Sequence, residues 1–151
     1  MHLETNRLYI IACTKEHACH DGYDNGPHIL YYLQQLEVDE TLVGWGIWFV
    51  VEKESNRIIG DIGFKGKPDA NKIVEVGYGF LEEYWNRGYA TEAVTTLVDW
   101  AFQTSEVDRV IAETLHDNIG SIRVLEKLGM KRTSLTDTMI NWELNNKSAQ
   151  C

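Results

Sequence analysis

The feature that most constrains the fold is a change of hydrophobic period at Gly88. Before this glycine, three runs rich in aromatic and β-branched residues follow one another with short connections, at 45–51, 58–64 and 73–80. Runs of this kind predict three strands of an antiparallel meander. After the glycine, apolar residues recur at helical spacing to about Gln103, which predicts an amphipathic helix.

Other periodic segments extend this pattern in both directions. Strands are predicted at residues 7–12, 108–115, 130–133 and 139–144, and helices at residues 28–37 and 118–128. Gly129 ends the second of these helices as a C-terminal glycine cap. Strands in runs, interrupted by a few helices, indicate an α+β fold in which helices pack on a sheet.

Length and composition predict one domain with no membrane span. The chain has 151 residues, and one domain typically has ~100–200, so a single domain is expected over residues 1–151. No apolar run approaches the ~20 residues that a membrane-spanning helix needs. The first residues also lack the charged-then-apolar order of a secretory signal. A cytoplasmic location and no membrane partner are therefore expected.

The charge balance argues against a nucleic-acid partner. The 14 Lys and Arg residues are outnumbered by 23 Asp and Glu residues, which gives a net charge of −9. Such a field repels phosphate backbones. It would attract a cationic amine, but an acidic surface also keeps a protein soluble, and solubility is the favoured interpretation.

The cysteines predict neither disulfides nor a metal site. Cys13, Cys19 and Cys151 are odd in number and have no framework spacing, so reduced thiols are expected. The nearest approach to a ligand set is the cluster of Cys13, His17, Cys19 and His20. Its spacing matches no structural zinc pattern, and no second ligand pair follows at a suitable distance. No bound metal is expected.

The turn from sheet to helix has the features of an anion site. In the segment Arg87-Gly88-Tyr89-Ala90 a helix start leaves backbone N–H groups unpaired, with a partial positive charge behind them. Glycine lets the backbone approach a pyrophosphate, and Arg87 adds a cation. The segment is neither a P-loop nor a dinucleotide fingerprint. By itself such a turn more often belongs to a loop in which Gly88 only satisfies the backbone geometry.

Four segments together resemble the GCN5-related N-acetyltransferase (GNAT) superfamily. They are Glu75-Val76-Gly77-Tyr78, residues 84–93, residues 118–130 and the opening residues 3–8. Within the superfamily they are similar to the branch that contains the ribosomal-protein N-terminal acetyltransferases. The resemblance implies a mixed, mainly antiparallel sheet of about six or seven strands flanked by helices. Its two central strands are expected to splay apart and admit the pantetheine arm of acetyl-CoA.

The resemblance also implies which residues bind acetyl-CoA. They are Val76, Gly77, Tyr78, Arg87, Gly88, Tyr89, Ala90, Thr91, Asn118 and Ser121. Gly88 and Ala90 match the family's pyrophosphate turn, whereas Trp85 stands where Gln or Arg is usual. Backbone N–H groups from about Arg87 to Thr91, together with the Arg87 side chain, are therefore expected to hold the phosphates.

Several of the neighbouring residues also have purely structural interpretations. Gly77 and Gly79 suit a close approach of another backbone, or only relieve crowding within the strand. Asn118 begins a helix, so it can cap that helix as well as contact pantetheine. Glu92 is expected to offset the helix dipole or support the loop. His116 is interpreted as a polar residue at a strand end rather than a catalytic group.

Catalysis requires a group that removes a proton from the amine. A lysine side chain has a pKa of ~10.4 and an α-amine ~7.7–8.0, so a base must act before or during attack. Glu75 lies on the strand where many family members keep a catalytic carboxylate and is the candidate base, although it can equally be an outward-facing strand residue. Ser121 is the candidate acid, because Leu125 occupies the position where many relatives carry a tyrosine. A water, or no acid at all, are the alternatives.

The leading function is direct transfer of acetyl from acetyl-CoA to a primary amine of a protein N-terminus, peptide or small molecule. No cysteine matches a nucleophile motif, so no acetyl-enzyme is expected. Trp85 and Leu125 keep open a catalytically weak or inactive acyl-CoA-binding module. A partner surface of exposed tryptophans, including Trp45 and Trp48, is a third hypothesis, although core packing explains such aromatics more simply. The acceptor is expected to contact residues within 14–44, and either a monomer or a homodimer is expected.

Overall fold

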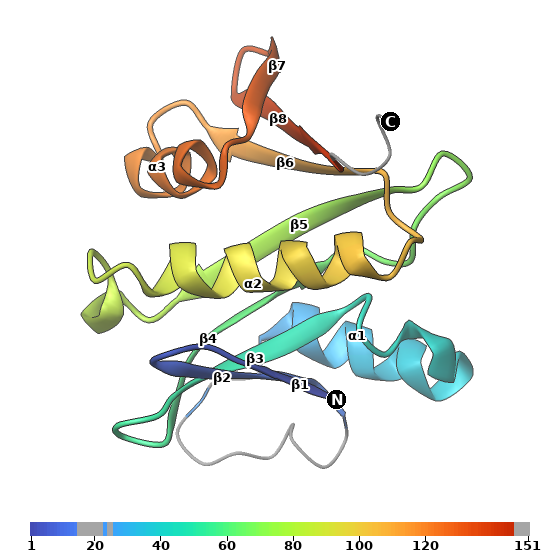
Figure 1. Cartoon of the computed structure of the whole chain (residues 1–151), viewed down its shortest axis with the longest axis vertical. Coiled ribbons are helices and arrows are strands. Elements are labelled where there is room, and N and C mark those ends of the chain that lie inside the picture. Colours follow the sequence, from blue (N-terminus) through green and yellow to red (C-terminus); the bar gives the residue numbers. More distant parts are fainter. Residues whose placement is uncertain (15–22, 24–25, 147–151) are drawn as a thin grey trace.

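The centre of the molecule is one eight-stranded sheet with the strand order β1-β2-β3-β4-β5-β6-β8-β7 (Figure 1). The computed structural model describes residues 1–14, 23 and 26–146. The strands are β1 (His2–Glu4), β2 (Leu8–Ala12), β3 (Ile47–Glu52), β4 (Arg57–Phe64), β5 (Ile73–Phe80), β6 (Arg109–Leu115), β7 (Lys131–Leu135) and β8 (Met139–Asn145). Every neighbouring pair is antiparallel except β5 and β6, which run parallel. The α+β class and the mixed, mainly antiparallel sheet are therefore confirmed.

The sheet has one strand more than the sequence patterns predict. The additional strand, β1, pairs with β2 through His2, Leu3 and Glu4 alone. A segment this short shows no alternation of buried and exposed side chains that a sequence pattern can reveal. The other strands and the helices begin and end within about two residues of their predicted bounds.

Helices cover both faces of the sheet. The described residues form α1 (Pro27–Val38), α2 (Tyr89–Gln103), α3 (Ile119–Leu128) and the 3-10 turns η1 (Glu40–Leu42) and η2 (Glu82–Tyr84). α2 and α3 pack on one face, where Leu97 and Leu125 are wholly buried, and α2 crosses the front of the sheet in Figure 1. α1 packs on the opposite face, where Ile29 and Tyr32 lie in a smaller core with Phe49.

Most of the tryptophans belong to the core. Trp48 and Trp142 are 0% and 2% exposed, and Trp45 is 7% exposed. The Trp100 ring centre lies 5.0 Å from that of Trp45 and 5.2 Å from that of Trp48. The hypothesis of a tryptophan-rich partner surface is therefore wrong for Trp45 and Trp48. Trp85, at 56% exposure, is the exposed member of the set.

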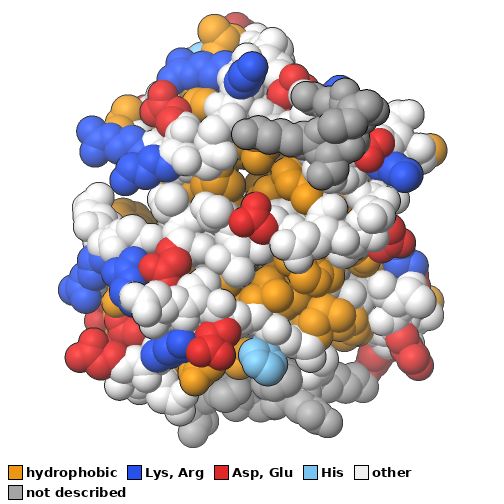
Figure 2. Space-filling model, viewed as in Figure 1, with side chains coloured by type: hydrophobic (Ala, Val, Ile, Leu, Met, Phe, Trp, Pro, Cys, Tyr) orange, Lys and Arg blue, Asp and Glu red, His pale blue; other side chains and the backbone are white. Residues whose placement is uncertain are grey.

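β5 and β6 pair only at their beginning. The paired residues are Ile73, Val74 and Glu75 opposite Arg109, Val110 and Ile111. After Glu75, β5 stays paired with β4 as far as Phe80, while β6 stays paired with β8 as far as Leu115. Figure 1 shows the two strands diverging towards the end of the sheet where α2 begins and α3 lies. Figure 2 shows a hollow with hydrophobic side chains between the upper part of the molecule, which contains α3, and the part that contains α2. The splay that the resemblance implies is present.

Two other sequence expectations concern the membrane and the Cys/His cluster. No helix within the described residues is long and apolar enough to cross a bilayer, and the cytoplasmic location stays a prediction. Of the cluster, His17, Cys19 and His20 lie outside the described residues. Cys13 is fully buried, and its burial raises the pKa of the thiol to about 12.

Candidate active site

The turn into α2 gathers unpaired backbone donors at one point. Gly88 is the N-cap of α2, with φ +81° and ψ 3°, a left-handed conformation that glycine adopts at least cost. The first intrahelical hydrogen bond runs from Glu92 N to Gly88 O at 3.0 Å. The N–H groups of Tyr89, Ala90 and Thr91 therefore have no intrahelical acceptor. Their partial positive charge suits a phosphate group.

Arg7, immediately before β2, contacts two residues of this turn. Its Nε lies 2.8 Å from Glu92 Oε1, and its Nη1 donates to the Arg87 carbonyl at 3.0 Å. The Thr5 hydroxyl also donates to Glu92. Burial acts to raise the pKa of Glu92, but the hydrogen bonds from Thr5 and Arg7 hold it below its usual value. Glu92 thus supports the loop. No role is predicted for Thr5 or Arg7 from the sequence, although both belong to the opening segment that resembles the family.

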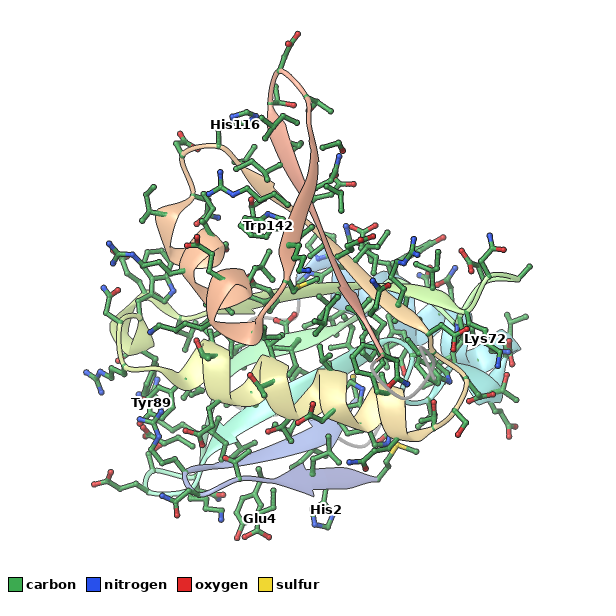
Figure 3. The ribbon with its side chains drawn as sticks, turned by 45° about the horizontal axis from the view of Figure 1, so that its top comes forward. His2, Glu4, Lys72, Tyr89, His116 and Trp142 are labelled. Atoms are coloured by element: carbon green, nitrogen blue, oxygen red, sulfur yellow. The ribbon has the colours of Figure 1, made fainter. Side chains whose placement is uncertain are left out.

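Tyr89 and Arg87 differ in what they can offer a ligand. The Tyr89 side chain is 8% exposed, and its hydroxyl donates to Glu52. Figure 3 shows Tyr89 at the beginning of α2. Because its hydroxyl is bonded to Glu52, the side chain anchors the turn, and Tyr89 can offer a ligand only its backbone N–H. Arg87 is exposed, with its guanidinium 5.6 Å from the Tyr84 ring centre. The residue directly before Gly88 therefore carries a full positive charge.

The register of β5 decides which of its backbone groups face the splay. Lys65 N donates to Glu75 O at 2.9 Å. By the alternation of an antiparallel ladder, Glu75 and Gly77 bond to β4, and Val76 and Tyr78 face the β6 side. Tyr78 lies beyond the last β5–β6 pair, so its N–H can polarise a carbonyl placed in the splay. Gly77 has no side chain, so it leaves the surface of β5 uncovered at this position.

Trp85, the departure from the family's pyrophosphate turn, closes the end of β5. Its indole Nε1 donates to the Phe80 carbonyl at 2.8 Å. By the same alternation this carbonyl faces the β6 side, where β6 has already diverged. Trp85 therefore satisfies a strand carbonyl that has lost its neighbouring strand.

The start of α3 lies across the splay from β5. Asn118 is the N-cap, and its Oδ1 accepts from Ser121 N at 3.2 Å, so the capping role is present. The Tyr78 hydroxyl donates to the Ser121 carbonyl at 3.2 Å and ties β5 to α3. Burial raises the pKa of Tyr78 to about 12, and the interaction with the Ser121 side chain opposes this shift. Leu125 is wholly buried, so its position belongs to the core.

Glu75 and His116 each contact another part of the chain. Glu75 alternates with the buried Val74 and Val76, so it projects on the α1 face, where its Oε2 is 2.6 Å from Lys65 Nζ. His116 Nε2 lies 2.8 Å from the Thr136 carbonyl oxygen. Figure 3 shows His116 in the loop between β6 and α3, and this contact ties the loop to the β7–β8 turn.

A depression of about 370 Å³ lies on the α1 face, at β4 and β5. Its lining residues are His28, Ile47, Asp61, Ile62, Gly63, Phe64, Lys65, Gly77, Tyr78 and Gly79. A Cβ atom at Gly79 would meet nothing within 4 Å, and one at Gly77 would meet only Lys65 Cε at 3.9 Å. These two glycines therefore leave the surface of β5 open.

Polar side chains from separate segments meet at one wall of this depression. The Asp61 carboxylate, 13% exposed, lies with Oδ1 2.8 Å from His28 Nε2. It also accepts a hydrogen bond from the Tyr23 hydroxyl. No sequence spacing relates these residues, because Asp61 belongs to a strand, His28 to a helix and Tyr23 to an irregular stretch. The sequence points to this group only through the expectation that the acceptor contacts residues within 14–44, a range that includes Tyr23 and His28 but not Asp61.

Comparison with known proteins identifies one family. Residues 14–131 match the family model described as an acetyltransferase (GNAT) domain. The uncharacterized N-acetyltransferase YjdG of Bacillus subtilis is 37% identical over 101 residues, which are 67% of this chain and 60% of that protein. The uncharacterized N-acetyltransferase YoaA of the same species is 27% identical over 146 residues, which are 86% of this chain and 82% of that protein. The matched part of the chain thus spans less than two thirds of YjdG.

Solved structures share the fold. RimL, described as a ribosomal L7/L12 α-N-protein acetyltransferase and solved in complex with coenzyme A, has a TM-score of 0.78 at 12% identity, over 93% of this chain and 95% of that chain. A GNAT-family acetyltransferase from Bacillus anthracis has a TM-score of 0.73 at 23% identity, over 97% of this chain and 99% of that chain. At these identities the likeness shows the fold alone.

Proposed function

Because the chain belongs to the GNAT acetyltransferase family, we propose that it moves the acetyl group of acetyl-CoA to a primary amine by direct transfer in a ternary complex. The observation that carries the proposal is the splay of β5 from β6 at the end of the sheet where α2 begins. A long, thin ligand with one anionic end suits such a site, with phosphates at the helix start and a narrow arm between the strands. Acetyl-CoA has this form.

We assign the donor's parts to named groups on this basis. The backbone N–H groups from Tyr89 to Thr91 bind the pyrophosphate, with Arg87 as the side-chain cation. Pantetheine runs beside Asn118 and Ser121, and the thioester carbonyl accepts from the Tyr78 N–H. Trp85 takes no part in phosphate binding in this arrangement, because its indole N–H is bonded to β5.

The reaction is a single acyl transfer. The neutral amine nitrogen attacks the thioester carbonyl carbon, a C–N bond forms, the C–S bond breaks and its electron pair leaves on sulfur. Glu75 accepts the proton that the amine loses, directly or through a water, on the carboxylate oxygen that does not contact Lys65. The Ser121 hydroxyl, or a water, returns a proton to the thiolate.

Thermal stabilisation and thiol release test this function. The protein is melted with and without millimolar acetyl-CoA and then assayed for free thiol with a panel of primary amines and peptides with free N-termini. We expect a higher Tm, equivalent to ~2.7 kcal/mol at about a hundredfold excess over Kd, and thiol release with at least one amine. No shift in Tm at millimolar acetyl-CoA would contradict the proposal. A shift without thiol release would indicate an acyl-CoA-binding module instead.

A further inference from the structure

We propose that the acceptor of this enzyme carries two amino groups, and that Asp61 binds the one that is not acetylated. This inference rests on the proposed acetyltransferase function and narrows its acceptor to short diamines and similar molecules. The reacting amine then lies at the edge of β5 beside the splay. The second amine, still protonated, lies at the wall of the depression on the α1 face.

The depression forms an open path between these two points. Asp61 on β4 lies opposite Gly79 on β5, and Gly63 lies opposite Gly77. The glycines on β5 have no side chains, and a Cβ added there would meet little or nothing. A thin aliphatic chain can therefore cross β4 and β5 from Asp61 to the backbone of Tyr78 without meeting a side chain of β5.

The Asp61 carboxylate is prepared to bind a cation. Its oxygens together offer about four lone-pair directions, and its contacts with His28 and Tyr23 fix its orientation without using all of them. Among the described residues, no lysine or arginine forms an ion pair with Asp61. Lys65, the lysine in the lining, lies 2.6 Å from Glu75 and its charge is balanced there. An ammonium group would thus supply a charge-assisted partner for a mostly buried carboxylate.

The spacing of the strands sets the length of the acceptor. Neighbouring strands lie ~4.8 Å apart, so a thioester that takes the place of β6 beside β5 lies about 10 Å from β4. A hydrogen bond of ~2.9 Å at Asp61 and an attack distance of ~3 Å at the thioester leave roughly 4–7 Å between the two nitrogens. This is the span of diaminopropane or diaminobutane with the amino groups at opposite ends.

A matched pair of amines isolates the second amino group. Diaminobutane and butylamine have the same carbon chain and differ by one amine. For the wild-type enzyme we expect kcat/KM for diaminobutane to exceed that for butylamine by roughly ten- to hundredfold, the size of a hydrogen bond to a charged group. In Asp61→Asn this ratio should fall by about tenfold or more. In Asp99→Asn, which removes an exposed carboxylate from α2, the ratio should stay at the wild-type value.

Further variants separate positioning from binding. Tyr23→Phe and His28→Gln each alter one partner of Asp61 but keep its carboxylate. Each should lower the ratio by a smaller factor, through KM for diaminobutane rather than kcat. The stabilisation of Asp61→Asn by acetyl-CoA reports whether that variant is folded. If it does not fold, the wild-type enzyme still decides, because its preference should be greatest for diaminopropane or diaminobutane, decline for diaminohexane and weaken with added salt.

The outcomes distinguish this inference from the proposed function. A wild-type enzyme that acetylates butylamine as efficiently as diaminobutane overturns the inference and leaves the acetyltransferase function standing. A folded Asp61→Asn variant that keeps the full ratio does the same. No thiol release with any amine overturns the proposed function, and the acceptor assignment with it.

Discussion

The two faces of the sheet build their parts of the site from different kinds of interaction. On the α2 and α3 side, the groups nearest the splay are backbone N–H groups held by a left-handed glycine at Gly88, together with the α3 start that Asn118 caps. On the α1 side, the depression depends on side chains, with Asp61 held by His28 and Tyr23. The first kind of site follows from local turn and helix signals, and the second exists only once distant segments have packed.

The same difference separates the two proposed substrates. Acetyl-CoA would be held through the backbone of one side, and the acceptor amine would be bound and deprotonated by carboxylates of the other. Substitutions on the α2 side should therefore change acetyl-CoA binding, and substitutions on the α1 side should change turnover and amine selection. Glu75→Gln and Gly88→Val test this division most directly.

The largest expected effect is that of Glu75→Gln on turnover. A carboxamide cannot accept the amine proton, and a general base contributes about 10²–10⁴-fold. We expect kcat to fall within this range while the Tm shift with acetyl-CoA stays unchanged, because the side chain projects on the α1 face. Steady-state thiol release and thermal melts measure the two quantities. Unchanged turnover across pH would remove Glu75 as the base, and a lost Tm shift would break the division between the faces.

The next effect is that of Gly88→Val on acetyl-CoA binding, for which the chain offers a matched control. Gly88 and Gly129 both have positive φ, at 81° and 89°, so valine at either position should cost about 1–3 kcal/mol in the free energy of unfolding. Only Gly88→Val disturbs the first turn of α2. We expect it to lose most of the Tm shift with acetyl-CoA, and Gly129→Val to keep it. Equal shifts in both variants would show that the turn does not bind the donor.

Most of the fold could be predicted because its signals are local. β5 occupies the predicted residues 73–80, since aromatic and β-branched residues mark it and turns bound it. β1 could not be predicted, because a three-residue strand is defined by its partner β2 rather than by its own pattern. The extent of the β5–β6 splay required the resemblance, because the residues after Glu75 read as ordinary strand.

The part of the site that backbone groups form could be predicted from the sequence. The part that side chains from separate segments form could not. Gly88 and Asn118 lie at the helix starts where the sequence patterns put them. The contact of Arg7 with Glu92 joins residues 85 positions apart, and Asp61 meets His28 across 33 positions. No periodicity relates residues at such separations, because folding, not spacing, brings them together.

Glu92→Gln tests how firmly the donor turn is braced. The folded-state pKa of Glu92 is lowered from its ordinary value, so the ionised carboxylate stabilises the fold above that ordinary pKa, and its contribution is lost as pH falls through the folded-state pKa. With partly exposed partners we expect a loss of only ~1 kcal/mol at pH 7. Urea unfolding at pH 7 and at lower pH should show the difference from wild type shrinking with acidity. A difference that grows on acidification would contradict this assignment.

The smallest effect is expected for Trp85→Phe, which keeps a ring and removes the donor to the Phe80 carbonyl. At 56% exposure water can replace the lost partner, so the free energy of unfolding should fall by less than ~1 kcal/mol. The Tm shift with acetyl-CoA should not change, because the indole N–H is bonded to β5 rather than aimed at a phosphate. Trp85→Gln, which restores the residue usual in the family, is the informative partner. Glutamine should increase acetyl-CoA affinity, whereas phenylalanine should leave it unaltered. This result would show that Trp85 bonds to the end of β5 instead of contacting a phosphate, and that the turn binds acetyl-CoA through its backbone and Arg87.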